Sequence, residues 1–283
     1  MATRRDFLKN ITLVSGLLAT SPLYAETLPP KGKIKKIGIQ LYTLRDIIKS
    51  DLKGTLASLG KIGYNSLEAY GFDGRFFEHS AKDFRELCND LGMDITSTHC
   101  GITVENASLY AEKAAEAGLG YLVLPSLMGR PGKTPDDFKK LAVEMNRIGE
   151  ITKKAGISFG YHNHKFEFEK IEGEIPYDIL LKETDPALVT FQMDIYWVVK
   201  GGFDPRHYFE KYSGRFGLWH IKDLGNDGDT CIVGNGQINF KDLLKKSKQA
   251  GLKRIIYEQE HYSEGTPLQC AELSFNYIKK HLI

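Results

Sequence analysis

Six short apolar segments of this 283-residue chain are each followed by side chains that could bind a metal ion or move a proton. In chain order these side chains are Glu68, His99, His162 with His164, Asp194, His220 with Lys222 and Asp223, and Glu258 with Glu260. Imidazole and carboxylate groups are suitable ligands for zinc, manganese, iron or cobalt, and they also act as general acids and bases. The elements that carry these residues decide whether they meet at one site.

The sequence Tyr161-His162-Asn163-His164 places two histidines at the end of a predicted strand. The preceding residues 157–161 are rich in β-branched and aromatic residues and follow Gly156, which is typical of a short buried strand. Residues two apart in a strand share a face, so both imidazoles point to one side if the strand continues. Taken alone, the pair has two interpretations. Both histidines could belong to a functional site, or one could be a hydrogen-bonded core residue and the other part of a solvated loop.

From residue 35 onward the chain alternates short apolar runs with longer amphipathic ones. Eight runs have the length and composition of strands: 37–41, 66–70, 95–98, 121–124, 157–161, 189–193, 216–219 and 254–257. Helical patterns such as 134–155 and 240–250 lie between them. Several helices begin with a capping residue and proline, at Thr134, Asp204 and Thr266. Several stop at glycine before the next strand, at Gly63, Gly92, Gly118, Gly156 and Gly251.

Repeated βα units predict an α/β fold, a single-domain (β/α)8 TIM barrel over residues 35–283. An open doubly wound sheet usually has fewer strands and a glycine-rich phosphate turn after the first one. Residues 42–46, which follow the first predicted strand, contain no such motif. Active sites of these barrels lie at the carboxyl ends of the strands, which is where the ionisable side chains occur.

Side chains after the last four predicted strands could surround one divalent ion, because successive barrel strands ring a single opening. Each also has an ordinary interpretation. Asp194 could cap the following loop, although a carboxylate after a buried run needs a partner. His220 could be a core histidine bonded to a backbone carbonyl, and one of Glu258 and Glu260 could form only a salt bridge. Convergence from four consecutive strands favours the metal site.

Seven motifs follow one another along the chain: Leu67-Glu68, Ser97-Thr98-His99, Tyr161-His162-Asn163-His164, Met193-Asp194, His220-Ile221-Lys222-Asp223, Gly234-Asn235-Gly236-Gln237-Ile238-Asn239-Phe240 and Tyr257-Glu258-Gln259. This ordered set, from residue 37 to the C-terminus, resembles the xylose isomerase-like barrels. That sugar phosphate isomerase/epimerase superfamily also contains inosose dehydratases and apurinic endonucleases.

In that family, glutamate, aspartate, histidine and glutamate from strands five to eight typically hold the metal. The resemblance implies Asp194, His220 and Glu258 as ligands of one divalent ion (Mn, Zn, Co, Fe or Mg), with His162 where the first glutamate usually stands. Family epimerases use two metal-bound glutamates to remove and return a proton, so His162 departs from their pattern. The Tyr-His-Asn-His sequence looks more like the inosose dehydratase and keto-sugar lyase branch.

The resemblance implies an enzyme that removes a proton next to the carbonyl of a sugar or keto-sugar, with the metal polarising that carbonyl. Reprotonation of the enediolate gives isomerisation or epimerisation. Expulsion of a β-substituent gives dehydration or lysis of a keto-sugar, keto-glycoside or inosose. Candidate bases are His164, Glu258 and Glu260, and Lys222 could stabilise developing negative charge.

Further residues are predicted to contact the substrate. Glu68 and His99 could hydrogen-bond sugar hydroxyl groups, and Lys222 could contact a sugar oxygen. Trp197 could stack on a sugar ring, together with Tyr196, Phe166 and Phe168.

The first 25 residues have the three parts of an export signal. A basic segment with Arg4-Arg5 precedes the apolar residues 11–18 and a small-residue stretch that ends at Ala25. The arginines followed by Phe7-Leu8-Lys9 resemble the twin-arginine signal. We expect a signal peptide at 1–25, a flexible leader at 26–34, and a periplasmic or exported protein without stable membrane insertion after cleavage. Since sugar phosphates are mostly cytoplasmic, the expected substrate is unphosphorylated.

Composition disfavours several other classes. Cleavage after Ala25 removes three basic residues and one acidic residue and takes the formal charge from +2 to 0. A neutral chain lacks the basic face that nucleic acids require, so an apurinic endonuclease is disfavoured and no nucleic-acid partner is expected. The four cysteines form no Cys-x-x-Cys motif, and no Gly-x-Ser-x-Gly hydrolase elbow is present. A non-catalytic sugar-binding barrel and a homo-oligomer stay open.

Overall fold

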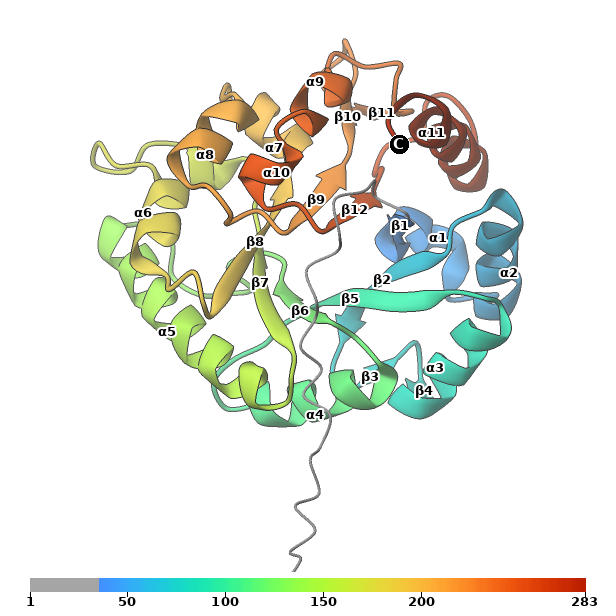
Figure 1. The fold of residues 1–283 in the computed structure, drawn as a ribbon, viewed down its shortest axis with the longest axis horizontal. Coiled ribbons are helices and arrows are strands. Elements are labelled where there is room, and N and C mark those ends of the chain that lie inside the picture. Colours follow the sequence, from blue (N-terminus) through green and yellow to red (C-terminus); the bar gives the residue numbers. More distant parts are fainter. Residues whose placement is uncertain (1–35) are drawn as a thin grey trace, which may run out of the picture. The chain divides into compact units, whose positions relative to one another are not determined.

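The computed structural model describes residues 36–283, which form a closed barrel of eight parallel strands with helices around it (Figure 1). The predicted signal peptide at 1–25 and leader at 26–34 lie outside the described residues. The predicted (β/α)8 fold is confirmed. Around the barrel the strands are β1 (Ile37–Gln40), β2 (Ser66–Phe72), β5 (Asp94–Cys100), β6 (Tyr121–Leu124), β7 (Ser158–His162), β8 (Val189–Asp194), β9 (Leu218–Ile221) and β12 (Arg254–Tyr257), which closes against β1.

Helices connect successive barrel strands. They are α1 (Arg45–Ile48), α2 (Leu52–Ile62), α3 (Ala81–Asp90), α4 (Ala107–Ala117), α5 (Pro135–Lys154), α6 (Pro176–Glu183), α7 (Ile195–Lys200), α8 (Pro205–Lys211), α9 (Phe240–Leu244), α10 (Ser247–Ala250) and α11 (Pro267–His281). The 3-10 helices η2 (Leu41–Leu44) and η3 (Phe166–Phe168) follow β1 and β7. Two hairpins lie outside the barrel sheet, β3 (Arg75–Phe76) with β4 (His79–Ser80) and β10 (Asp223–Leu224) with β11 (Thr230–Cys231).

Helix ends follow the predicted capping residues. Thr134 begins α5 in a capping box with Asp137. The five predicted stop glycines all have positive φ, and Gly118 (80°) and Gly251 (81°) are left-handed C-caps. The helix predicted at 240–250 is instead the pair α9 and α10, because N–H groups between them donate to carbonyls three residues earlier and tighten the chain.

The seventh strand differs from its prediction. Residues 216–219 were expected, whereas β9 begins two residues later, at Leu218. The N–H of Phe216 donates to the carbonyl of Ala250 at 2.9 Å, so this residue belongs to the connection from the preceding helix. The strand also ends later than predicted, at Ile221, so His220 lies inside it instead of after it.

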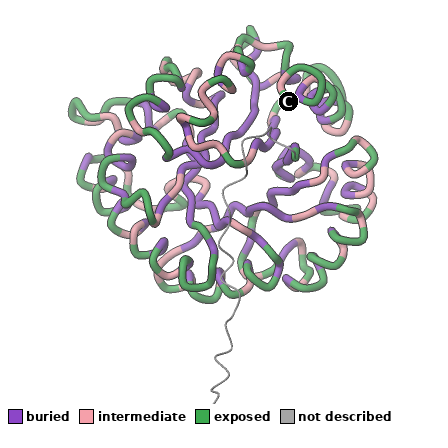
Figure 2. The backbone as a smooth tube through the Cα atoms, viewed as in Figure 1, coloured by how far each residue is buried: buried purple, intermediate pink, exposed green. Residues whose placement is uncertain are grey.

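The barrel strands are buried, whereas the outer faces of the helices are exposed (Figure 2). In β6, Leu122 and Leu124 belong to the large apolar cluster, while Tyr121 and Val123 form a small separate cluster with Leu218. This alternation is typical of a barrel strand with one face toward the helices and one toward the interior. Among residues 36–283, no helix has the length and apolar character needed to cross a membrane.

Candidate metal centre

The four residues predicted to bind a metal ion come together at the carboxyl ends of four neighbouring strands. His162 and Asp194 are the last residues of β7 and β8. His220 is the register partner of Asp194, and Glu258 directly follows β12. One donor atom from each residue lies within 4.8 Å of the others. All four side chains are buried, which places four donors around one enclosed point.

This donor set fits a divalent cation. The Oδ2 atom of Asp194 is buried and accepts no hydrogen bond within residues 36–283. It lies 3.9 Å from both His162 Nε2 and His220 Nδ1. A buried carboxylate oxygen without a hydrogen bond requires positive charge beside it, and the Lys222 ammonium 3.5 Å away supplies one such charge. Two imidazoles and two carboxylates match the preferences of zinc, manganese, iron and cobalt, so these residues could hold such an ion.

Gln192 determines which nitrogen of His162 faces the donor cluster. The Nε2 atom of Gln192 donates to Glu68 Oε2 at 2.6 Å, so its Oε1 is the atom 3.0 Å from His162 Nδ1. His162 Nδ1 therefore carries a proton, and the lone pair of Nε2 faces Asp194. Burial and the charge of His220 lower the pKa of His162 well below its ordinary value, so the imidazole is neutral and able to bind a cation.

Glu68 is a fully buried carboxylate bonded from several strands. Its Oε1 lies 2.7 Å from His220 Nε2 and accepts from Gln40 Nε2 at 2.8 Å. Its Oε2 accepts from Ser97 Oγ at 2.5 Å and from Gln192 Nε2. Burial would raise the pKa of Glu68, but the neighbouring histidines lower it well below its usual range. Its predicted contact with substrate stays a prediction, while its observed contacts orient His220 toward the donor cluster.

His220 is held between two carboxylates. Its Nδ1 lies 2.8 Å from Glu258 Oε2, and its Nε2 faces Glu68. Burial would lower the pKa of His220, but the two carboxylates raise it to about 10. A cation that replaces the Nδ1 proton would be stabilised by Glu258, while His220 Nε2 keeps its proton and donates it in a hydrogen bond to Glu68.

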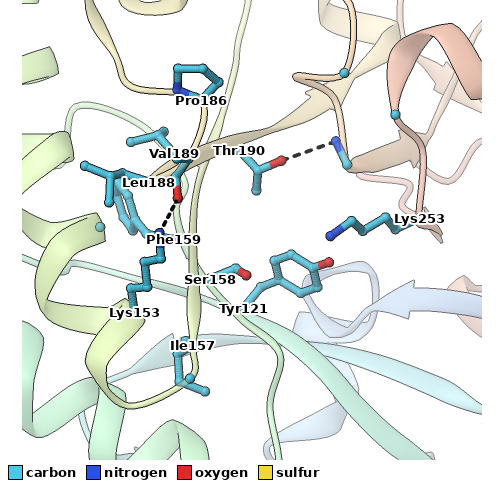
Figure 3. A pocket seen from close by; sticks show the side chains of 16 residues that line it. Tyr121, Lys153, Ile157, Ser158, Phe159, Pro186, Leu188, Val189, Thr190 and Lys253 are labelled. Atoms are coloured by element: carbon cyan, nitrogen blue, oxygen red, sulfur yellow. Dashed lines mark hydrogen bonds between the residues drawn. The ribbon is translucent and has the colours of Figure 1, made fainter. Parts of the chain in front are cut away.

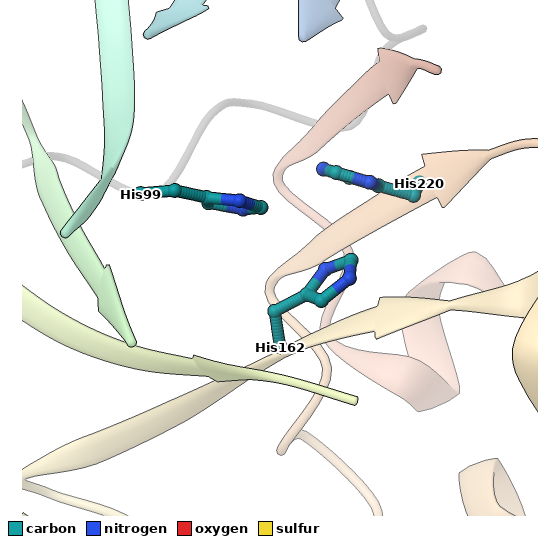
Figure 4. Close-up of side chains that lie close together, drawn as sticks. All are labelled: His99, His162 and His220. Carbon is teal, nitrogen blue, oxygen red and sulfur yellow. The ribbon is translucent and has the colours of Figure 1, made fainter. Parts of the chain in front are cut away.

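His99, His162 and His220 form a second group of three imidazoles (Figure 4). The His99 ring centroid lies 4.9 Å from that of His162 and 5.6 Å from that of His220. However, His99 Nε2 lies 2.7 Å from Gln192 Oε1, the same oxygen that accepts from His162 Nδ1. In the other group, Asp194 Oδ2 and His162 Nε2 have no such hydrogen-bond partner among the described residues, so that group is better suited to bind a cation. The predicted contact of His99 with substrate stays a prediction.

Lys222 brings a buried positive charge to the donor cluster. Its Nζ lies 3.5 Å from Asp194 Oδ2 and 3.4 Å from Glu258 Oε2, and it donates to Glu260. Burial would lower the pKa of Lys222, but these carboxylates raise it above its ordinary value, so the side chain is an ammonium. Burial likewise acts to raise the pKa of Glu258, but Lys222 and His220 lower it.

His164 lies beside the cluster with an unpaired ring nitrogen. Its Nδ1 is buried and has no hydrogen bond to any described residue. Its ring centroid lies 5.0 Å from that of His162 and 5.6 Å from that of Trp197. Burial, and next the charge of Lys222, lower the pKa of His164 to about 4, so the imidazole is neutral at pH 7. A neutral, unpaired imidazole in this position can accept a proton.

The remaining predicted residues divide between the site and the core. Trp197 faces Lys222, whose Nζ lies 5.1 Å from the ring centroid, and the indole Nε1 has no hydrogen bond within the described part of the chain. Phe166 stacks on His164 with an interplanar angle of 15°. Phe168, in contrast, points into the core against Tyr177, Phe203 and Tyr208.

Comparison with known proteins identifies the family and relatives that share the fold. Residues 56–281 match the xylose isomerase-like TIM barrel family. The chain belongs to this family. A sugar phosphate isomerase/epimerase from Parabacteroides distasonis ATCC 8503 is 33% identical, covers 91% of this chain and 98% of its own, and superimposes with a TM-score of 0.79.

Two further relatives share less of the sequence. An inosose dehydratase from Clostridium tetani is 27% identical over 182 residues, which are 57% of this chain and only 60% of the relative's length. The crystal structure of an IOLI protein with a bound zinc atom shares the fold, with 16% identity, a TM-score of 0.68, and coverage of 88% of this chain and 100% of that one.

Some residues that shape this xylose isomerase-like site were missed in the sequence. Gln192 lies two residues before Asp194 and therefore on the same face of β8, and Gln40 ends β1 in the same way. A polar residue inside an apolar strand needs a buried partner, and that rule could have identified both. Asn163 and Glu167 had no such signal, because both lie after the predicted strand, in a segment where polar residues are ordinary.

Proposed function

We propose that this protein is a divalent-metal-dependent enzyme of the sugar isomerase/epimerase type. It would remove a proton next to the carbonyl of an unphosphorylated sugar or keto-sugar. The observation that carries the proposal is the buried donor set, His162, Asp194, His220 and Glu258, beside a neutral His164. The isomerase/epimerase and inosose dehydratase relatives support the same class of chemistry.

The site residues have distinct roles in this proposal. A divalent ion held by the donors would supply Lewis-acid polarisation of the substrate carbonyl and an adjacent hydroxyl. His164 Nδ1 would accept the carbon-bound proton, because it is neutral and has no partner among the described residues. The Lys222 ammonium would stabilise the negative charge that develops on oxygen. Trp197 would orient the sugar through its ring face and its N–H.

One observation favours β-elimination as a second candidate. Epimerisation needs proton transfer on both faces of the carbon, whereas elimination needs one base and a donor for the departing group. His162 stands where family epimerases have a glutamate, and its Nδ1 proton is bonded to Gln192, which leaves His164 as the neutral base. Glu260, whose side chain is 36% exposed and paired with Lys222, could pass a proton to a leaving group. The substrate would then be a keto-sugar, keto-glycoside or inosose.

Hydrogen exchange with solvent tests the proposal. Metal-loaded protein in deuterated water is incubated with a panel of keto-sugars and inososes, and label and products are followed by mass spectrometry. We expect deuterium at the carbon next to the carbonyl, and loss of a β-substituent if elimination occurs. His164→Gln should lower the rate about 100-fold or more. The control His207→Gln alters an exposed residue of α8 and should leave the rate unchanged.

The assay also separates the competing functions. Fully metal-loaded protein that binds these sugars but neither exchanges nor eliminates would contradict the proposal and indicate a sugar-binding barrel. Equal rates with and without the metal would contradict the metal-dependent mechanism. The preference for unphosphorylated sugars rests on the proposed export, which mass analysis of the mature chain would test by showing cleavage after Ala25.

A further inference from the structure

The turn that follows β7 is held by two buried side chains that belong to neither the donor set nor the proposed proton acceptor. Asn163 and Glu167 both have exposed fractions of 0%. Asn163 bonds to the backbone of Asp194, and Glu167 bonds to the backbone of His164 and to the Tyr161 hydroxyl. Burial of an amide or a carboxyl group is unfavourable unless its hydrogen bonds are made, so these contacts define the turn.

Asn163 joins the exits of β7 and β8. Its Nδ2 donates to the carbonyl of Asp194 at 3.2 Å, and its Oδ1 accepts from the N–H of Asp194 at 3.1 Å. The last registered pair between the two strands is His162 with Gln192. The asparagine side chain therefore supplies the backbone bonds that Asp194 no longer receives from β7. It also fixes the spacing between Asp194 and the adjacent His162, which are two of the four donors.

Glu167 fixes the other half of the turn. Its Oε1 accepts from the hydroxyl of Tyr161 at 2.7 Å, and its Oε2 accepts from the N–H of His164 at 2.8 Å. One carboxyl group thus ties the backbone of His164 to the strand beneath it. Phe166, in the same turn, stacks on the His164 ring, so the turn sets the position of the imidazole.

A purely structural turn would not require a buried acid. Glu167 lies in η3 next to Phe168, whose ring packs against Tyr177. Burial in these surroundings raises the pKa of Glu167 to about 8. The same two bonds could be made by a neutral amide side chain such as that of glutamine. What the carboxyl group provides is a defined backbone position at His164.

We propose that Asn163 and Glu167 are positioning residues with separate tasks. Asn163 sets the spacing of His162 and Asp194 and thereby the affinity for the metal ion, and Glu167 sets the place of His164 as proton acceptor. The second task rests on the proposed function, whereas the first concerns metal binding alone. The two tasks can therefore fail independently.

Metal titration tests the role of Asn163. Metal-stripped full-length protein is titrated with Zn²⁺ and with Mn²⁺ by calorimetry, with the melting temperature recorded in parallel. Asn163→Leu should weaken binding about 10- to 100-fold, the range typical for residues that orient ligands. Asn163→Ser, which keeps one hydroxyl for bonding, should show a smaller loss and serves if the leucine variant does not fold.

The chain contains a matched control for this experiment. Asn146 makes the same kind of clamp far from the site, because its Oδ1 accepts from the N–H of Asp185 at 2.8 Å and its Nδ2 donates to the carbonyl of Glu183 at 3.1 Å. Asn146→Leu should lower the melting temperature but leave metal affinity unchanged. Metal binding of wild-type strength in a folded Asn163 variant, or equal losses in the Asn163 and Asn146 variants, would overturn the role of Asn163.

Two substitutions test the role of Glu167. In Glu167→Gln the amide oxygen can accept from His164 and the amide N–H can donate to the Tyr161 hydroxyl, so the exchange rate should stay within about threefold of wild type. Glu167→Leu keeps an apolar volume but leaves the Tyr161 hydroxyl and the His164 N–H without their acceptor, so the melting temperature should fall. At a temperature where the variant is still folded, its exchange rate should fall about 10-fold or more, with unchanged metal affinity.

Amide hydrogen exchange gives a readout that does not depend on activity. The backbone N–H of His164 should be protected in wild type and in Glu167→Gln, and should lose that protection in Glu167→Leu. Unchanged protection in the leucine variant would overturn the clamp. If Glu167→Leu loses this protection but reacts as fast as wild type, Glu167 is not needed to position His164 for the reaction. If no reaction is found with any sugar, amide protection and metal affinity still test both residues.

Discussion

The two ends of the barrel differ in the ionisable side chains that they bury. At the amino-terminal ends of β6, β7 and β8 lies a cavity of about 310 Å³ (Figure 3). No Asp, Glu or His is among the described residues that line it, and its polar groups are the hydroxyls and lysines Ser158, Thr190, Tyr121, Lys153 and Lys253. Their contacts are ordinary ones, such as Lys153 Nζ to the carbonyl of Ala187 at 3.3 Å.

The carboxyl-terminal end has the opposite character. His162, Asp194, His220, Lys222 and Glu258 lie there with exposed fractions between 0% and 5%. Buried charges are unfavourable unless they are paired, and Asp194 Oδ2 lacks a hydrogen bond within residues 36–283. The candidate site is thus distinguished by buried, interlocked charge, as expected for a fold whose chemistry takes place at the carboxyl ends of its strands.

Removing one of the four candidate donors should have the largest effect on metal binding and on the exchange rate. Asp194→Ala deletes the carboxylate shared by the His162, His220 and Lys222 contacts. We expect the loss of measurable metal binding by calorimetry and the loss of solvent exchange. The matched change at the opposite end, Thr190→Val, should alter neither quantity. Metal binding of undiminished strength in Asp194→Ala would contradict the proposed donor set.

The buried acid near the carboxyl end should make stability depend on pH. Glu167 keeps its proton up to about pH 8 in the folded chain, against an ordinary value of 4.5. Between these values unfolding releases a proton, so stability should fall as pH rises from 4.5 toward 8, by at most about 5 kcal/mol. Urea unfolding of wild type and Glu167→Gln measures this. Parallel pH profiles for the two proteins would refute the prediction.

Removal of the buried ammonium should separate binding from chemistry. Lys222→Met takes a positive charge away from Asp194 and Glu258, so metal affinity should not decrease. The exchange rate should fall about 100-fold, because charge on the substrate oxygen loses its stabilising partner. Steady-state exchange at saturating metal is the measurement. A variant with weaker metal binding and a normal rate would reverse the assigned role.

A smaller effect is expected from the carboxylate behind His220. Glu68→Gln keeps the shape but removes the charge that faces His220 Nε2, and metal affinity should fall about 10- to 100-fold. Glu144→Gln is the control, because Glu144 pairs with Arg130 at 2.7 Å away from the donors. Calorimetric titration of both variants decides whether Glu68 acts through His220.

The least effect is expected at the amino-terminal cavity. Ser158→Ala removes an exposed hydroxyl from its lining and should change the free energy of unfolding by no more than about 0.5 kcal/mol. Metal affinity and exchange rate should match wild type. A loss of either in this variant would show that the amino-terminal end takes part in function, and the contrast between the two ends would no longer hold.

The barrel and the convergence of the four candidate donors could be predicted because the signals are local. The strands are short apolar runs, five of them after a predicted glycine stop, and each candidate donor follows such a run. Contacts that orient the donors are not local: His220 meets Glu68 across 152 residues of chain, and Gln192 meets Glu68 across 124. The start of β9 was misplaced for a similar reason, because Phe216 is apolar but bonds to Ala250 outside the sheet.

Anomalous diffraction from crystals grown with Zn²⁺ or Mn²⁺ would show directly whether the four candidate donors bind one metal ion. We expect one strong peak per chain, in contact with His162 Nε2, Asp194 Oδ2, His220 Nδ1 and Glu258, and absent from crystals of Asp194→Ala. A peak bound instead through His99, or a protein that reacts with its sugar substrate while no metal binds between these four residues, would contradict this expectation.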